Sequence, residues 1–236
     1  ALTIPAAGGV DSTALIIGDF SNGNDGIVIK GDGKRVADLK GMNVNLVELS
    51  VSHYLLARGL ESAGLAEKDL KVVNTSDADM VAAFTTADVQ AAVTWNLMVV
   101  NSTTLKDNPA LGKALTGAWY EIMATMSANT PAGTSALEHM AKASGTDLAG
   151  FKAQLAATRM FYSAQEAVAF ATSEQLPATM AKVAEFSHSH GLLGEGAKSA
   201  DAIGMSFANG ATFGDTGNLK LRFEPTFMQM AADGKL

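Results

Sequence analysis

Short apolar runs bounded by polar or glycine-rich segments recur through the first hundred residues, a pattern typical of alternating strands and helices. Three of these runs predict buried strands, at 25–30, 42–48 and 70–74. Between the second and third runs, Leu56, Leu60 and Ala63 recur at helical spacing, with Ser50 as the N-cap and Gly64 after the last turn. This order predicts a mostly parallel sheet with helices on both faces.

Two shorter helices are expected around these strands. One is predicted at 35–40, because Gly41 follows it in the position of a C-cap. The other is predicted to run from Ser76 to Phe84, since Ser76 and Asp79 have the spacing of a capping box.

After residue 100 the apolar positions follow a helical period, which predicts a series of consecutive helices. Asn108 and Pro109 supply an N-cap and a first-turn proline. The helix that they begin carries one apolar stripe, consisting of Leu111, Leu115, Ala118, Trp119, Ile122, Met123 and Met126. Pro177 is predicted to begin a later helix. Two further helix starts are predicted from capping-box pairs, Ser135 with Glu138 and Ser163 with Glu166.

The start of the chain and the junction at Asn96 are both unusual. The chain opens with a short apolar helix, a Gly8-Gly9 turn and a predicted strand at 14–17. Farther on, the strand-like runs QAAVTW and LMVV are separated by Asn96 alone, whereas a hairpin normally needs at least a two-residue turn. We therefore expect the natural protein to contain residues before Ala1 and between Asn96 and Leu97.

Composition excludes several classes of protein. With 47% hydrophobic and 17% charged residues, the chain is expected to form a compact fold with a large core. A net charge of −7 argues against a nucleic-acid partner, which requires clustered Lys and Arg. Cysteine is absent, so the sequence has no disulfide framework, thiol nucleophile or thiolate metal site. No apolar run approaches the roughly 18 residues that span a bilayer.

Three segments lie where ligands bind in open α/β sheets, at the carboxyl ends of strands. The first, at 18–26, contains Asp19 and Ser21 and is either a plain loop or a hinge whose polar groups face a cleft. The second holds Glu48, Ser50 and Ser52 at a strand-to-helix junction. Free N–H groups and hydroxyls at such a junction can hold a polar ligand, although a simple N-cap explains the same residues.

The third segment places Trp95 and Asn96 at a strand end, where an aromatic ring is either a core residue or the wall of a pocket. No catalytic motif accompanies these segments. The four histidines lack the H-E-x-x-H spacing of a metalloprotease, and no nucleophile elbow, P-loop or dinucleotide fingerprint is present. The sequence therefore identifies no catalytic residue, metal site or cofactor, while a pair of acids for general acid–base chemistry, which no spacing singles out, stays open.

Long stretches resemble solute-binding proteins of the nitrate, sulfonate, taurine and thiamine-precursor class, and most of all the branch encoded beside urea carboxylases. The stretches that carry the resemblance are GDFSNGNDGIV, VELSVSHYLLARGLESAGL, NTSDADMVAAFTTADVQAAVTWN, LKDNPALGKALTGAWYEIM and FMQMAADGKL. The resemblance implies the type II periplasmic-binding-protein fold, in which two α/β lobes are joined by a hinge and the ligand lies in the cleft. It also implies that the N-terminal part of the first lobe is missing.

The resemblance further implies a division of the chain and a set of ligand-binding residues. Residues 1–21 and 97–236 would form one lobe, and residues 22–96 the other. By position, the expected site residues are Asp19 and Ser21 at the first crossing, Ser50 and Ser52 at a helix N-terminus, and Trp95 and Asn96 opposite. Glu48 is added on physical grounds, because a carboxylate there suits an N–H-rich ligand.

The expected function is that of an extracytoplasmic, periplasmic or membrane-associated, solute-binding component of an ABC importer, a monomer that delivers its ligand to a permease. Glu48 and Trp95 favour a small nitrogen-rich ligand of the urea or guanidine type over a sulfonate or nitrate, which remains the alternative. An enzyme of thiamine-pyrimidine synthesis with the same fold is disfavoured, because those relatives use a cysteine-rich motif. A binding module of a receptor also remains open.

Overall fold

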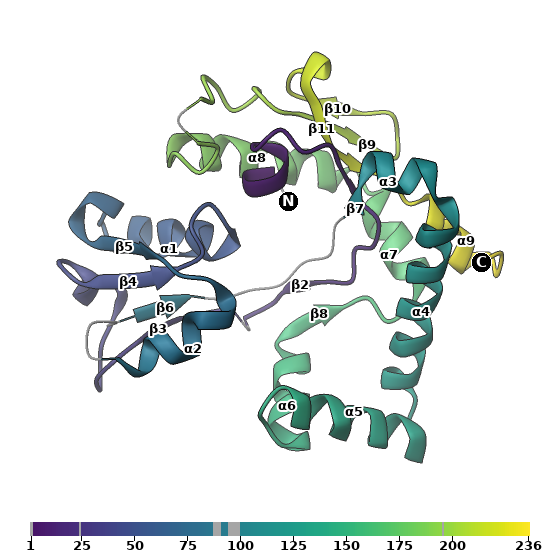
Figure 1. The fold of residues 1–236 in the computed structure, drawn as a ribbon, viewed down its shortest axis with the longest axis horizontal. Coiled ribbons are helices and arrows are strands. Elements are labelled where there is room, and N and C mark those ends of the chain that lie inside the picture. Colours follow the sequence, from purple (N-terminus) through teal and green to yellow (C-terminus); the bar gives the residue numbers. More distant parts are fainter. Residues whose placement is uncertain (1, 24, 87–90, 94–99, 195) are drawn as a thin grey trace.

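The computed structural model describes residues 2–23, 25–86, 91–93, 100–194 and 196–236. Its strands form two separate sheets and one two-stranded ribbon, and Figure 1 shows the two sheets lying apart, with helices around each. The mixture of parallel strands and covering helices confirms the predicted α/β class.

The smaller sheet has four strands in the order β3 (Ile27–Ile29), β6 (Ala91–Val93), β4 (Asn43–Leu46) and β5 (Lys71–Asn74). β4 is parallel to both of its neighbours, and β3 is an antiparallel edge strand, as expected for a mostly parallel sheet. Two helices, α1 (Val51–Ser62) and α2 (Asp77–Thr85), follow β4 and β5. We call residues 25–93 the four-stranded unit.

The core of the four-stranded unit lies between β4 and α1. Its fully buried side chains are Leu39, Val44, Leu46, Leu56 and Leu60. The helical spacing of Leu56 and Leu60 therefore predicted the buried face of α1 correctly. The segment predicted as a helix at 35–40 is instead a short 3₁₀ turn at Val36–Leu39, and a second 3₁₀ turn, Glu67–Asp69, precedes β5.

The larger sheet has five strands in the order β10 (Thr212–Phe213), β9 (Gly204–Phe207), β11 (Leu219–Phe223), β1 (Ser12–Ala14) and β7 (Val100–Asn101). β11 is parallel to both neighbours, whereas β10 and β7 are antiparallel edges. β1 covers 12–14 rather than the predicted 14–17, because pairing with β11 ends at Ala14. Leu15, Ile16 and Ile17 are nevertheless buried, which explains why their run looked like a strand.

Helices surround the five-stranded sheet and extend away from it. The helices are α3 (Ser102–Asp107), α4 (Pro109–Ser127), α5 (Pro131–Ala143), α6 (Leu148–Ala156), α7 (Ala164–Ala171), α8 (Gln175–Ser189) and α9 (Thr226–Ala232), and π-helical Leu2–Ala6 and 3₁₀ Thr216–Asn218 are shorter turns. Buried residues of the N-terminal π turn and of α8 pack with Met205 and Leu221 on one face of the sheet. We call this sheet with its helices the five-stranded unit.

Further predictions for the helices were wrong in detail. α8 begins at Gln175, so Pro177 lies in its first turn and does not begin it. α5 begins at Pro131 with Thr130 as its cap, so Ser135 lies inside the helix and is not the predicted capping residue. In α4, Ala118 and Ile122 of the predicted stripe are exposed. The buried residues of that helix are Gly112, Thr116, Met123 and Met126. None of the described helices is both long and apolar enough to cross a membrane.

A short ribbon leads from the five-stranded unit toward the four-stranded unit. β2 (Asp19–Ser21) pairs with β8 (Thr158–Met160), and Figure 1 shows β2 running toward the smaller sheet. Gly18, directly before β2, has no room for a side chain, because a Cβ there would lie 2.4 Å from Cζ2 of Trp119 in α4. The indole of Trp119 thus packs on the backbone at the start of this crossing.

Candidate functional site

A cavity of about 340 Å³ lies between the start of α1 and the five-stranded unit. Ser50, Val51 and Tyr54 line it from the four-stranded unit. The opposite wall is mostly aliphatic and aromatic and includes Ile16, Leu176, Met180, Val183, Leu221 and Phe223. A cavity of this size, apolar with a few polar groups, is typical of a site for a small molecule.

The turn that joins β4 to α1 forms the polar end of this cavity. Ser50 is the N-cap, as predicted: its Oγ accepts a hydrogen bond from the backbone N–H of Ser52 at 3.1 Å and donates one to the carbonyl of Val47 at 2.6 Å. Leu49 has φ of 58°, and it is the one non-glycine residue with positive φ in the part of the chain that the structure describes. Such a conformation costs about 1–2 kcal/mol and needs support from its surroundings.

That support comes from His53, one turn into α1. Its imidazole is 6% exposed, and Nδ1 accepts a hydrogen bond from the backbone N–H of Leu49 at 3.0 Å. Nε2 lies 2.9 Å from Oε1 of Glu67, without the alignment of a full hydrogen bond. Because Nδ1 accepts, the neutral ring carries its proton on Nε2, on the side of the carboxylate.

Two polar groups at the cavity have no partner among the described residues. The N–H of Val51 is in the first turn of α1, where no carbonyl of the helix can accept it. The hydroxyl of Ser187 in α8 belongs to a side chain that is 0% exposed, lines the same cavity and makes no hydrogen bond in the described structure. The positive end of the α1 dipole adds to these donors, so the polar end of the cavity favours an anion.

The second predicted segment is only partly at the cavity. Ser50 lines it, but Ser52 is 3% exposed and contributes its backbone N–H to the cap instead. Glu48 is exposed and does not line the cavity; its backbone N–H donates to Oδ1 of Asn74 at 3.0 Å. Trp95 and Asn96 lie outside the described residues.

The first predicted segment belongs to the ribbon that leads between the units. Asp19 and Ser21 are the two ends of β2, and neither lines the cavity. Burial, and secondarily the charge of Asp25, raises the pKa of Asp19. Ser21 is exposed, and its hydroxyl accepts a hydrogen bond from the backbone N–H of Asp25 at 3.3 Å. Both residues therefore lie on the ribbon and outside this cavity.

Tyr54, Val51 and Ser187 were not among the predicted site residues. Tyr54 follows the predicted site segment in α1, and its spacing from Ser50 would have indicated the same face of the helix. Ser187 is far away in the sequence, within an apolar helix, and no local pattern distinguishes it. Only the packing of α8 beside α1 brings it to the cavity.

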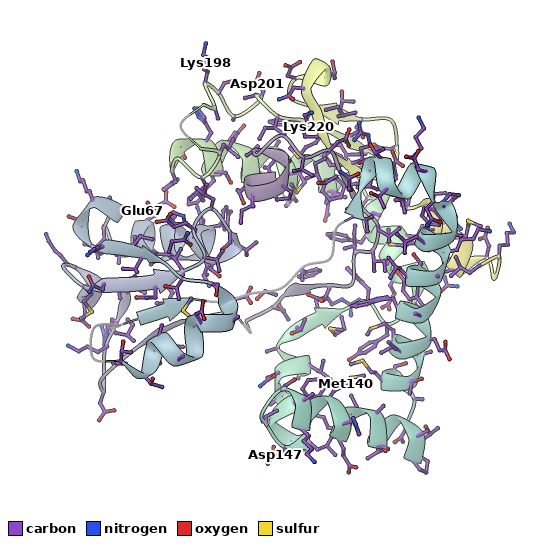
Figure 2. All side chains as sticks on the ribbon, in the orientation of Figure 1. Glu67, Met140, Asp147, Lys198, Asp201 and Lys220 are labelled. Atoms are coloured by element: carbon purple, nitrogen blue, oxygen red, sulfur yellow. The ribbon has the colours of Figure 1, made fainter. Side chains whose placement is uncertain are left out.

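An aromatic cluster joins the two units beside the cavity. The ring centroids of Tyr54 and Phe186 are 4.7 Å apart, and the guanidinium of Arg58 lies 4.8 Å from the centroid of the same Phe186 ring. His190 stacks on that ring at 3.9 Å. We call these four residues the aromatic clasp. A second cavity follows it along α1, and Glu67, labelled in Figure 2 on the four-stranded unit, lines it together with His190.

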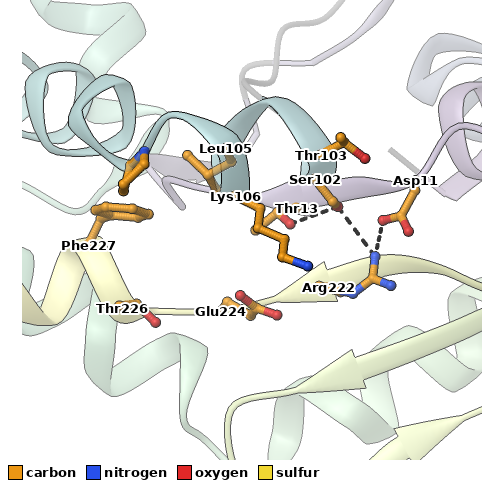
Figure 3. Close-up of a pocket in the computed structure, with 11 residues that line it drawn as sticks. Asp11, Thr13, Ser102, Thr103, Leu105, Lys106, Arg222, Glu224, Thr226 and Phe227 are labelled. Atoms are coloured by element: carbon orange, nitrogen blue, oxygen red, sulfur yellow. Dashed lines mark hydrogen bonds and ion pairs between the residues drawn. The ribbon is translucent and has the colours of Figure 1, made fainter.

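A separate cavity of about 530 Å³ lies on the other face of the five-stranded sheet. Figure 3 shows Lys106 reaching into it from α3, with Glu224 on the far side. Arg222 pairs with Asp11 and donates to the hydroxyl of Ser102 at 3.3 Å. Lys106 and Arg222 are balanced by Asp11 and Glu224 among the lining residues, so the cavity has no excess of charge to select an anion or a cation.

The described residues do not form a metal centre. No group of three or more His, Cys, Asp or Glu side chains in the described ranges is placed to hold a metal ion. The buried histidine, His53, has both ring nitrogens directed at protein groups and does not line the 340 Å³ cavity. The geometry at the cavity is that of a binding site.

Comparison with known proteins agrees with this description. The model of the NMT1/THI5-like family matches residues 24–115. An aliphatic sulfonates-binding protein of Escherichia coli K12 is 38% identical over 93 residues, which are 37% of this chain and 28% of that protein. The matched part therefore spans less than a third of the relative's length. The chain is similar to the broad class of solute-binding proteins that its sequence resembled, whereas a closer likeness to the branch beside urea carboxylases is not supported.

Two of the solved structures with a similar fold are sulfonate-binding proteins. The alkanesulfonate-binding protein SsuA of Xanthomonas axonopodis pv. citri, bound to MOPS, has a TM-score of 0.62 at 19% identity, over 80% of this chain and 72% of that one. The periplasmic aliphatic sulphonate-binding protein SsuA of Escherichia coli has a TM-score of 0.52 at 19% identity and the same coverage. These likenesses confirm the predicted periplasmic-binding-protein fold.

Proposed function

We propose that this chain is the solute-binding component of an ABC importer and that it captures small organic anions with an apolar tail, of the alkanesulfonate type. The observation that carries the proposal is the meeting of two unlike surfaces in one cavity. The first turn of α1 provides the unpartnered N–H of Val51, α8 provides the unpartnered hydroxyl of Ser187, and the rest of the opposite wall is aliphatic and aromatic.

An alkanesulfonate matches both surfaces. Its head group stays ionised and offers oxygens that accept hydrogen bonds from the N–H of Val51 and from the unpartnered hydroxyl of Ser187, near the end of α1 where the helix dipole favours negative charge. Its hydrocarbon tail would lie against Met180, Val183 and Leu221, and each buried methylene contributes about 0.8 kcal/mol. Nitrate lacks such a tail, so the apolar wall favours the larger anion.

The expected preference for urea or guanidine has lost its main support. It depended on a carboxylate in the cleft, but Glu48 is exposed and does not line the cavity. The stacking partner expected in Trp95 lies outside the described residues. A sulfonate, the alternative to that preference, agrees with the similarity of this chain to aliphatic sulfonate-binding and alkanesulfonate-binding proteins.

The proposed mechanism is closure of two lobes around the ligand. The lobes would be residues 22–96 and residues 1–21 with 97–236, and β2 would be part of one crossing. Closure brings α1 onto α8, which is how the ligand becomes enclosed by both units. In this role the protein acts outside the cytoplasm, and a membrane permease is its partner. Binding without covalent chemistry is sufficient for it, so we propose no enzymatic step.

Isothermal titration calorimetry with 1-hexanesulfonate, MOPS, taurine, nitrate, urea and guanidine tests the proposal. We expect hexanesulfonate or MOPS to bind most tightly, with a negative heat-capacity change from burial of the tail. At a hundredfold excess over Kd the ligand should stabilise the folded protein by about 2.7 kcal/mol in thermal unfolding. Tighter binding of guanidine, urea or nitrate than of both sulfonates would overturn the ligand class.

A further inference from the structure

His53 makes a buried contact with the turn before α1, and the proposed function does not yet use this contact. His53 does not line the cavity, yet it bonds to the residue whose backbone conformation is the most unusual in this turn. Leu49 adopts φ of 58°, and its N–H points at Nδ1 of His53 at 3.0 Å. No other described group accepts that N–H, so the imidazole is what satisfies it.

The other backbone donors of the turn are already used. The N–H of Glu48 is bonded to Asn74, that of Ser50 to the carbonyl of Val47, and that of Ser52 to the Ser50 hydroxyl. This leaves the N–H of Val51 without an acceptor among the described residues, and Val51 lines the cavity. The direction in which the first turn of α1 presents its donors therefore depends on the shape of the residues 47–50.

We propose that His53 is a positioning residue for the ligand: its Nδ1 holds the N–H of Leu49 and so keeps the turn in the conformation that directs the first-turn donors of α1 into the cavity. The inference depends on the proposed function for the identity of the ligand, but the contact it invokes belongs to the protein alone. Glu67 contributes by facing Nε2, which favours the tautomer with the proton on that nitrogen.

Two substitutions of His53 test the contacts of Nδ1 and of Nε2 separately. In His53→Asn the side-chain amide can place its oxygen near the former Nδ1 position and accept the N–H of Leu49. In His53→Gln the longer side chain places its amide near the former Nε2 position, which keeps the contact with Glu67 and loses the acceptor for Leu49. Both substitutions remove the ring from the core, so a purely structural role predicts similar losses for both.

Two measurements on the whole protein should differ between these variants. We expect His53→Gln to bind 1-hexanesulfonate and MOPS about tenfold more weakly than the wild type, because a buried N–H is left unsatisfied and the turn relaxes. His53→Asn should stay near the wild-type affinity. Hydrogen exchange at the Leu49 amide should be fast in His53→Gln and protected in the wild type and in His53→Asn. His139 is an exposed histidine of α5, and His139→Gln serves as the control. It should change neither the affinity for the sulfonates nor the exchange rate of the Leu49 amide.

The outcomes distinguish this inference from the proposed function. If the wild type binds neither sulfonate, the ligand class is wrong, and exchange at the Leu49 amide still decides the role of His53. If the two variants lose the same affinity and the same protection, the positioning role is wrong although the ligand class stands. Nitrogen-15 spectra of the wild-type imidazole give an independent check, since a protonated Nδ1 in the neutral ring would also overturn the inference.

Discussion

Asp19 is a charged residue held in a half-buried position at the start of the ribbon between the units. Its pKa is raised from 3.8, first by burial and second by the charge of Asp25. The folded protein therefore binds this proton more tightly than the unfolded chain does. The contribution to stability is complete below the unfolded pKa and is lost as the pH rises through the folded pKa.

Asp19→Asn should remove this dependence. We expect the variant to be more stable than the wild type at neutral pH and to lack the decline that this carboxyl causes above about pH 4. Urea unfolding of both proteins from pH 4 to about 7 measures the difference. Asp25→Asn should give a smaller change in the same direction, because burial is the larger cause. Parallel stability curves for Asp19→Asn and the wild type would contradict the expectation.

Burial of the Ser187 hydroxyl is expected to lower the stability of the ligand-free protein. Its hydroxyl has no partner among the described residues although the side chain is fully buried at the cavity wall. Ser187→Ala should raise the stability of the ligand-free protein by up to about 1 kcal/mol, since an unsatisfied group is removed. The same change should weaken hexanesulfonate binding about threefold to tenfold, because a donor near the head group is lost.

The matched control for Ser187 is Ser173→Ala. The Ser173 hydroxyl also lacks a partner among the described residues, but it does not line the cavity. This variant should alter stability in the same direction and leave affinity unchanged in calorimetry. If Ser187→Ala binds hexanesulfonate as tightly as the wild type, Ser187 makes no contact with the ligand.

At the scale of a single element, the N-terminus of α1 combines a structural and a binding role. Ser50→Ala removes the cap and should destabilise the protein by about 1 kcal/mol, and it should also weaken hexanesulfonate binding. Ser163→Ala removes the cap of α7, which is part of a reciprocal capping box with Glu166, and provides the comparison. Chemical denaturation should show similar losses for both, whereas calorimetry should show reduced affinity for Ser50→Ala alone. Equal affinities would argue against a ligand at α1.

Element boundaries were predictable where the signal is local. Ser50, Asn108 and Ser163 cap their helices as expected, because a cap involves only residues within one turn. The prediction of Ser135 as a cap was wrong because Thr130 and Pro131 form an equally good start five residues earlier, and the pair Ser135 and Glu138 therefore lies inside the helix. The sequence offers both starts, and it does not show which one the chain uses.

Only the part of the site that lies on the four-stranded unit was predictable from the sequence. Ser50 was found because the junction of β4 and α1 has a local pattern, and that junction does line the cavity. Ser187, Val183 and Leu221 come from segments more than 130 residues away, and only packing of the five-stranded unit brings them there. Glu48 was expected in the cleft, but the left-handed conformation of the next residue, Leu49, was not foreseeable from the sequence.

At the scale of the whole molecule, the aromatic clasp connects the two units and should favour the closed form. Arg58→Ala removes a guanidinium from the ring of Phe186, a contact worth about 0.5–1 kcal/mol at exposed sites. We expect about twofold to fivefold weaker ligand binding and a larger radius of gyration in X-ray scattering, because the open form becomes more populated. Phe186→Ala removes the whole clasp and should have a larger effect.

Arg159→Ala is the matched control for the clasp. Arg58 and Arg159 have side chains that are both 53% exposed, each pairs with a glutamate, and each lies over a phenylalanine. Arg159 makes its ring contact with Phe161, away from the α1–α8 contact. Arg159→Ala should therefore leave affinity and radius unchanged. Equal effects of the two substitutions would show that the clasp does not control closure.

The packing of Trp119 on Gly18 has an optical consequence. The indole N–H of Trp119 is buried and has no partner among the described residues, and its ring touches the backbone where the chain leaves for β2. The proposed rotation about this crossing changes the surroundings of the ring, to which indole emission is sensitive. The chain contains two tryptophans, so Trp95→Phe leaves Trp119 as the single tryptophan, which can be excited selectively over the tyrosines. The protein would then report ligand capture by its own fluorescence, in real time and without an attached dye.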